Sequence, residues 1–240
     1  MLAIVEAGGI APLVDLLRDG SADAKEEAAR ALGNLAWDNA AIRVAIAEAG
    51  AIAPLVELLR DGSVEAKFWV ARALRNLACN NAANKVAIAE AGGIPPLVEL
   101  LRDGSAEAKS DAANALRNLA DNNAANKVLI VEAGGIPPLV ELLRNWYAKE
   151  QAAWALQNLA RNNDGSAIAI AVAVGFEALI QLARGGRVTV KDHSGVLLIV
   201  WYPAGVPVKR KAALVVAALL GDCVPDSTPR DIKAVIGSYL

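Results

Sequence analysis

An asparagine recurs along this chain at a nearly fixed interval. Asn34, Asn76 and Asn118 are each 42 residues apart, and Asn158 follows after a further 40. A side-chain amide both donates and accepts hydrogen bonds, so a row of amides can pair with the N–H and C=O groups of polypeptide backbone. That backbone belongs either to neighbouring helices of the same protein or to another chain. The spacing alone leaves both interpretations open.

Aromatic and arginine side chains share a helical stripe with these asparagines. Trp69 and Arg72 precede Asn76 by seven and four residues, which places all three on one face of a helix. Exposed tryptophan beside arginine is typical of binding hot spots. We therefore expect Trp69 to be solvent-exposed and to contact a ligand, with packing against a neighbouring helix as the alternative. The positions that match Arg72 in the other copies hold Arg30, Asn114 and Trp154.

Few residues of this chain could support catalysis or hold a metal. Its one histidine, His193, follows Asp192 directly, and adjacent residues of a helix point apart. Its two cysteines, Cys79 and Cys223, lie too far apart in the sequence for a disulfide framework or a zinc cage, and neither has a basic cluster nearby. We therefore expect no enzymatic activity, no metal site and no cofactor.

Charge and hydropathy argue against two further kinds of partner. Lys and Arg total 24 against 26 Asp and Glu, so no global basic field would recruit nucleic acid. The most apolar run, Ala167 to Phe176, has ten residues, whereas a membrane-spanning helix needs about 20. The N-terminus has no basic region followed by an apolar stretch, so no secretory signal is visible in the sequence. We expect a cytoplasmic protein without membrane insertion, with the nucleus as the alternative location.

The elements that position the stripe are repeated. Segment 38–79 matches segment 80–121 at 31 of 42 positions, and a diverged later copy is legible around Gly175. Units of this length bury their apolar faces only by stacking on one another, so the sequence predicts a solenoid. The string EAG marks the same point of four copies, at Glu6, Glu48, Glu90 and Glu132.

Each repeat is predicted to contain three helices and no strand. In the third copy, a first helix over roughly 84–91 ends at Gly92, a residue suited to the left-handed conformation that terminates helices. Pro95 opens the second helix, where the missing N–H of proline costs nothing. Ser105 caps the third helix, which runs to about Ala120.

A three-helix unit of about 42 residues with the motifs EAGGIPPLVELL and AxxALxNLA resembles the armadillo repeat. The resemblance covers residues 1–203 and implies an all-α fold, a right-handed α-solenoid of armadillo repeats. It predicts that Val190 to Tyr202 form the third helix of the fifth repeat. The expected units are a first repeat 1–37 with a truncated first helix, repeats 38–79, 80–121 and 122–161, a diverged repeat 162–203, and a diverged C-terminal helical cap 204–240.

Armadillo proteins bind extended peptides in a concave groove lined by third helices, with one asparagine from each repeat. The resemblance therefore implies a non-enzymatic protein-interaction module whose partner is an extended peptide segment or a larger complex. The implied backbone-binding residues are Asn34, Asn76, Asn118 and Asn158. The implied side-chain contacts come from Trp69, Arg72, Trp154, Arg30 and Asn114.

The resemblance leaves the charge of the partner open. Trp154 precedes Asn158 by four residues, like the Trp/Asn pairs with which importin-α clamps lysine side chains. This chain contains one such pair, whereas importin-α has one in repeat after repeat. Arg30 and Arg72 at the matching positions resemble the β-catenin groove, which meets acidic segments. Acidic residues interleave with these arginines, namely Glu27, Asp38 and Asp111.

The N-terminal end supports an alternative function. Met1 aligns with Lys127, so the chain opens inside a first helix, and the apolar side chains of Leu2 and Ile4 face no preceding repeat. Three explanations fit this end: a longer chain was trimmed, the end docks on a partner or on a second copy, or it is frayed. We favour a fragment or a subunit seated in a larger assembly. The alternative is therefore a scaffold subunit that braces a larger assembly through its N-terminal end or its convex face. A fragment, a subunit and a consensus-based design all fit the repeats.

Overall fold

The computed structural model describes residues 7–143 and 147–161, residues 163, 166, 170 and 173, and the backbone of 188–191 and 197–200. The chain divides into two compact units, residues 1–159 and 160–240.

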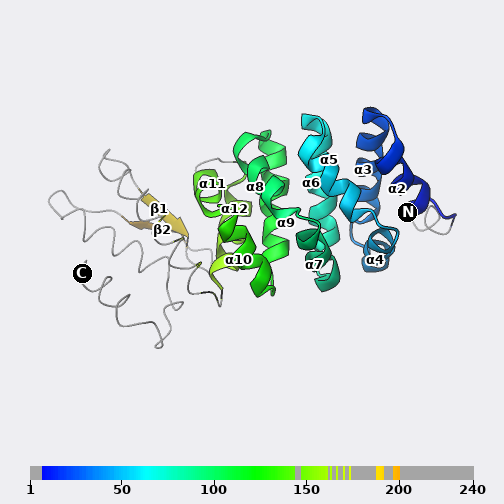
Figure 1. Cartoon of the computed structure of the whole chain (residues 1–240). Helices are drawn as coiled ribbons and strands as arrows, with labels where there is room; N and C mark the ends of the chain where they lie inside the picture. The colour runs from blue at the N-terminus through cyan, green and yellow to red at the C-terminus, as the bar shows by residue number, and fades with distance from the viewer. Residues whose placement is uncertain are drawn as a thin grey trace. The chain divides into compact units, whose positions relative to one another are not determined.

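The first unit is a row of stacked helices. In Figure 1 the third helices α3, α6 and α9 follow one another along the row, each packed on the next. The described helices are α2 (Ile10–Asp19) and α3 (Ala22–Leu35) in repeat 1, and α4 (Ala40–Glu48), α5 (Ile52–Asp61) and α6 (Val64–Ala78) in repeat 2. Repeat 3 has α7 (Ala82–Glu90), α8 (Ile94–Asp103) and α9 (Ala106–Ala120), and repeat 4 has α10 (Ala124–Glu132), α11 (Ile136–Leu142) and α12 (Lys149–Ala160).

Serine side chains cap the third helices α3, α6 and α9, as the sequence predicts, and asparagine side chains cap the first helices α4, α7 and α10. Ser105 Oγ accepts a hydrogen bond from the backbone N–H of Ala108 at 3.2 Å, and α9 follows it directly. Asn81 Oδ1 accepts from the N–H of Asn84 at 3.0 Å, so α7 begins two residues before the predicted start. Asn80, the residue before this cap, has a φ of 51°, a left-handed conformation that asparagine tolerates better than most residues.

A glycine ends each first helix beneath an arginine of the preceding repeat. Gly92 has a φ of 75°, which confirms the predicted left-handed stop. Arg60 Nη2 donates to the carbonyls of Ala91 and Gly92, each at 3.2 Å, and a Cβ on Gly92 would lie 2.6 Å from that nitrogen. A cation at the negative end of a helix is favourable. Arg18 and Arg102 make the matching contacts with the carbonyls of Gly50 and Gly134.

Alanine and leucine fill the core between the repeats. Ala112, Ala113, Leu116 and Leu119 are at most 1% exposed, which confirms the predicted buried face of α9. A Cβ on Gly33 of α3 would lie only 3.2 Å from the Cα of Ala73 in α6. These small side chains let successive third helices approach closely.

The prediction of a helix over Val190 to Tyr202 is wrong. Two strands, β1 (Val188–Lys191) and β2 (Leu197–Val200), pair antiparallel with Val188 opposite Val200. Both strands are rich in β-branched residues, and the five residues between them include Gly195, a composition that favours a hairpin. The predicted cap over 204–240, most of 162–203 and the first six residues lie outside the described residues.

Candidate peptide-binding face

The four predicted asparagines lie on the third helices of successive repeats. We call this surface the third-helix face. It consists of the four asparagines in α3, α6, α9 and α12, together with the residues one, four and seven positions before each of them. Asn34 is exposed, Asn76 is buried at 5% exposure, and Asn118 and Asn158 are half-buried. The asparagines therefore become less accessible wherever another repeat precedes them.

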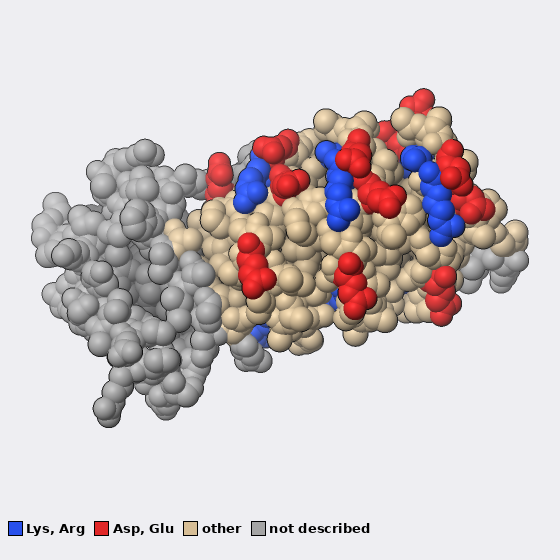
Figure 2. Space-filling model, in the orientation of Figure 1, with Lys and Arg blue, Asp and Glu red and all other residues tan. Residues whose placement is uncertain are grey.

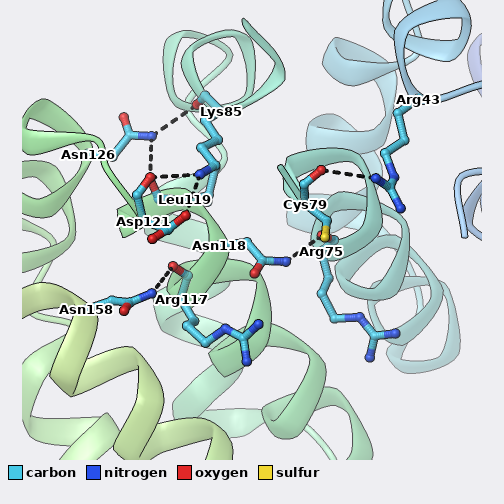
Figure 3. Close-up of polar contacts among 10 residues, drawn as sticks. All are labelled: Arg43, Arg75, Cys79, Lys85, Arg117, Asn118, Leu119, Asp121, Asn126 and Asn158. Carbon is cyan, nitrogen blue, oxygen red and sulfur yellow. Dashed lines mark hydrogen bonds and ion pairs between the residues drawn. The ribbon is translucent and has the colours of Figure 1, made fainter. Parts of the chain in front are cut away.

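Three of these asparagines bond to the backbone of the preceding repeat. In each case the acceptor is the carbonyl of the residue directly before the matching asparagine, and Figure 3 shows two of the bonds. The Nδ2 atoms donate from Asn76 to Gly33 O at 2.9 Å, from Asn118 to Arg75 O at 2.9 Å and from Asn158 to Arg117 O at 3.2 Å. One N–H of each amide is therefore used within the solenoid.

The donor and acceptor groups that each amide keeps for a ligand differ along the row. Asn76 Oδ1 accepts from Arg75 Nε at 3.2 Å, which leaves this side chain little capacity for a ligand. Within the described residues, the Oδ1 atoms of Asn118 and Asn158 take part in no further hydrogen bond, and each amide keeps its second N–H. Their role in holding the main chain of a ligand stays a prediction.

Trp69 is less exposed than the sequence analysis expected. Trp69 is half-buried, and the guanidinium groups of Arg30 and Arg72 lie 5.5 and 5.6 Å from its ring centroid. Phe68 packs against it with ring centroids 4.7 Å apart. The position is not generally exposed, since its counterpart Asp111 is only 7% exposed. The cause is the neighbouring third helix, which places an arginine beside this position.

Arg75 connects three repeats, which the sequence analysis missed. Its Nη1 pairs with the carboxylate of Asp111 in α9, and its guanidinium lies 5.3 Å from the ring centroid of Trp37, after α3. Burial raises the pKa of Asp111 above its ordinary value of 3.8, although Arg75 and Arg72 partly offset this effect. The sequence feature that could have indicated this role of Arg75 is its recurrence 42 residues later as Arg117.

Trp154 is exposed by 46%, but one face of its ring is covered. The guanidinium of Arg117, from the preceding repeat, lies 5.3 Å from the ring centroid. An arginine of the protein itself thus occupies a place where a cation of a ligand would stack. Arg30 is exposed, and Arg72 and Asn114 are half-buried on the same face.

A second row of asparagines crosses the repeats along the first helices. We call Asn84 and Asn126 the first-helix row; they are 3% and 2% exposed. Asn84 Nδ2 donates to the carbonyls of Arg43 and Leu77, at 3.2 and 3.0 Å. Asn126 Nδ2 donates to the carbonyls of Lys85 and Leu119, each at 3.1 Å (Figure 3). This row was not predicted from the sequence, although Asn84 and Asn126 are also 42 residues apart.

Basic side chains of the first helices lie beside the first-helix row and bond to the ends of third helices. Lys85 Nζ donates to the carbonyl and the carboxylate of Asp121, at 2.7 and 3.3 Å, at the end of α9. Arg43 reaches the carbonyls of Ala36 and Cys79, at 2.9 and 3.3 Å, at the ends of α3 and α6. Cations therefore neutralise the negative ends of the third helices.

Charged side chains of both signs lie among uncharged residues on the face of the described repeats that Figure 2 draws. Figure 2 shows basic and acidic side chains in regularly spaced groups that lie side by side. Within the described residues, no His, Cys, Asp and Glu side chains converge in a group that could hold a metal, and no helix is long and apolar enough to cross a membrane.

An apolar hollow of about 480 Å³ lies at the first repeat. Pro12 and Leu16 of α2 line it and are exposed. Asn34 of α3 also lines it and forms no hydrogen bond to another repeat among the described residues. The remaining lining residues are Gly9, Leu13, Ala31 and Leu35.

A family model described as Armadillo/beta-catenin-like repeat matches four segments of the chain, residues 2–37, 39–79, 81–121 and 123–161. The chain belongs to the armadillo repeat family. This membership confirms the resemblance seen in the sequence and the armadillo solenoid fold. A comparison with curated proteins finds no match.

Solved structures of designed armadillo proteins are similar to this armadillo chain. A designed armadillo repeat protein in complex with the peptide (KR)4 is 32% identical, with a TM-score of 0.68 over 90% of this chain and 84% of that one. A computationally designed armadillo repeat protein for modular peptide recognition is 31% identical, with a TM-score of 0.71 over 91% of this chain and 85% of that one.

Proposed function

We propose that this chain is a protein-interaction module that binds an extended peptide segment along its third-helix face. The observation that carries the proposal is the state of Asn118 and Asn158. Each amide is held by one hydrogen bond to the preceding repeat and keeps an acceptor and a second donor. A similar designed protein forms a complex with a peptide, which supports the same use of the fold here.

The fixed N–H prepares these amides for recognition. A bond to the neighbouring carbonyl orients the side chain before a ligand arrives, so less rotamer entropy is lost on binding. The free acceptor and donor match the N–H and C=O of one peptide unit. Packed helices lie about 10 Å apart, so two neighbouring asparagines span roughly three residues of an extended chain.

The test compares the two rows of asparagines. Peptides of about ten residues are selected from a displayed random library, and the affinity of a selected peptide is measured by calorimetry for the wild type and for Asn118→Ala/Asn158→Ala. Each hydrogen bond left unmade in the interface costs about 1–3 kcal/mol, so we expect a loss of at least about 2 kcal/mol. Asn84→Ala is the control, because this buried side chain faces no ligand.

Two outcomes would contradict the proposal. The first is an unchanged affinity in a double variant that still shows the wild-type circular dichroism spectrum. The second is an equal loss of affinity in the Asn84→Ala control, which would mean that the binding loss reports destabilisation of the solenoid rather than lost contacts with the peptide.

The hollow at the first repeat favours a second candidate, a scaffold subunit that self-associates through its N-terminal end. Leu55 and Leu77 in repeat 2, which match Leu13 and Leu35 of the hollow, are at most 1% exposed because repeat 1 covers them. A helix pair of a second copy would cover the hollow in the same way. Sedimentation should then show a dimer that Leu16→Glu dissociates; a wild-type monomer at high concentration would exclude this candidate.

A further inference from the structure

The charges on the third-helix face do not balance. Six of its residues are charged, of which four are arginines and two are acidic. Asp38 lies beyond α3 in the following turn, and Asp121 beyond α9 is paired with Lys85. The face therefore has a net positive charge although the whole chain has a formal charge of −2. Its charged residues are Glu27, Arg30, Arg72, Arg75, Asp111 and Arg117.

Both acidic side chains of the face are already paired. Glu27 lies 3.2 Å from the guanidinium of Arg30, one turn along the same helix. Asp111 pairs with Arg75 of the preceding repeat. Arg72 and Arg117 form no ion pair among the described residues, although Arg72 is close enough to Asp111 to lower its pKa. Two guanidinium groups are therefore left without a carboxylate of their own.

These two arginines are held in place by tryptophan. Arg72 lies over the ring of Trp69 and Arg117 over that of Trp154, with 5.6 and 5.3 Å to the ring centroids. The attraction to the indole restrains each guanidinium and leaves its N–H donors without a carboxylate acceptor. An ordered guanidinium edge suits the two oxygens of a carboxylate, which accept parallel hydrogen bonds. An indole does not neutralise the charge, so a basic ligand would be repelled.

We propose that the third-helix face binds an acidic peptide segment whose carboxylates pair with Arg72 and Arg117. This inference rests on the proposed function and adds the chemistry of the ligand. Arg72 and Arg117 come from neighbouring third helices, but Arg117 extends over Trp154 of the next one, so their guanidinium groups are more than one helix spacing of about 10 Å apart. The paired acidic residues are therefore more than about three positions apart in an extended segment. The ligand is thus opposite in charge to the (KR)4 peptide bound by the similar designed protein.

The test uses three labelled peptides of equal length, (DE)4, (NQ)4 and (KR)4, and fluorescence anisotropy at low and at about 0.15 M salt. Every residue of (DE)4 is acidic, so the binding register need not be known. We expect (DE)4 to bind at least about tenfold more tightly than (NQ)4 at low salt, with a smaller advantage at higher salt. The formal charge of −2 would favour (KR)4 if attraction were unspecific.

Two double variants with the same change of charge assign the effect. Arg72→Gln/Arg117→Gln should abolish the preference for (DE)4 over (NQ)4. Arg18→Gln/Arg102→Gln should retain it, because these arginines contact first-helix carbonyls away from the face. Asp111→Asn should raise the affinity for (DE)4 several-fold, since it releases Arg75 from its ion pair.

Three results would overturn the inference. Tighter binding of (KR)4, weakened by Asn118→Ala/Asn158→Ala, would keep the proposed function and reverse the charge of the ligand. A preference for (DE)4 that survives Arg72→Gln/Arg117→Gln would place the acidic site elsewhere. No binding of any of the three peptides would reject the charge inference, whereas the proposed function would still be decided by the affinity of the selected library peptide.

Discussion

The two rows of asparagines make the same kind of bond with different consequences. In the first-helix row, Asn84 and Asn126 are almost fully buried and each bonds to two carbonyls. On the third-helix face, Asn118 and Asn158 are half-buried and each bonds to one. The Nδ2 atom of each first-row amide donates to two carbonyls of the solenoid, whereas Asn118 and Asn158 on the third-helix face keep an N–H and an acceptor for a ligand.

This difference separates stability from recognition. A buried amide with two partners holds repeats together, and its loss leaves carbonyls that water cannot reach. A half-buried amide with one partner contributes less to folding, and water or a ligand can satisfy its remaining groups. A residue that recurs in every repeat is therefore not a binding residue on that ground alone.

The largest expected effect is that of Asn126→Ala on stability. The substitution removes both hydrogen bonds of the side chain and leaves the carbonyls of Lys85 and Leu119 without this partner in the core. We expect the free energy of unfolding to fall by about 2–4 kcal/mol, measured by urea denaturation. A loss below that for Asn118→Ala would break the comparison between the two rows.

A smaller effect is expected for Asn118→Ala. It removes one bond, to the carbonyl of Arg75, at a half-buried position where water can replace the amide. The unfolding free energy should fall by about 1 kcal/mol. Asn34→Ala is the matched control and should change it by less than about 0.5 kcal/mol, because Asn34 is exposed and crosses no repeat boundary among the described residues.

The smallest effect concerns pH and Asp111. Burial raises its pKa in the folded protein above the ordinary value of 3.8, so the folded state binds this proton more tightly than the unfolded state. The contribution of Asp111 to stability is therefore greatest below the unfolded pKa and falls as the pH rises through the folded pKa. Denaturation at several pH values should show Asp111→Asn gaining stability relative to the wild type over that range. A constant difference would contradict the raised pKa.

Local rules predicted most of the helices. Ser105, Pro95 and Gly92 act within a few residues of their own positions, and the structure places the cap, the helix start and the left-handed stop there. The hairpin of β1 and β2 was missed because repeat register was extended into a segment whose composition favours strands. In a diverged copy, the local amino-acid composition predicts secondary structure better than alignment with the earlier repeats does.

The candidate site was only partly predictable. The sequence located the row from Asn34 to Asn158 and the stripe beside it, but it could not show that Arg75 pairs with Asp111 or that Arg117 covers Trp154. Those contacts join residues of neighbouring repeats, and their geometry depends on how closely the third helices pack. For that reason the prediction that the Trp69 position is exposed was wrong for its counterpart in repeat 3, Asp111, which is buried.

The sequence by itself determined the period, the helices within each repeat and the identity of the amides, because capping, helix propensity and apolar spacing act over short distances along one chain. Only the tertiary structure decided which amide groups are used in bonds between repeats and which arginines are left without a carboxylate. Hydrogen bonds and ion pairs between repeats depend on distances of a few ångströms across an interface, and these distances exist only once the repeats have stacked.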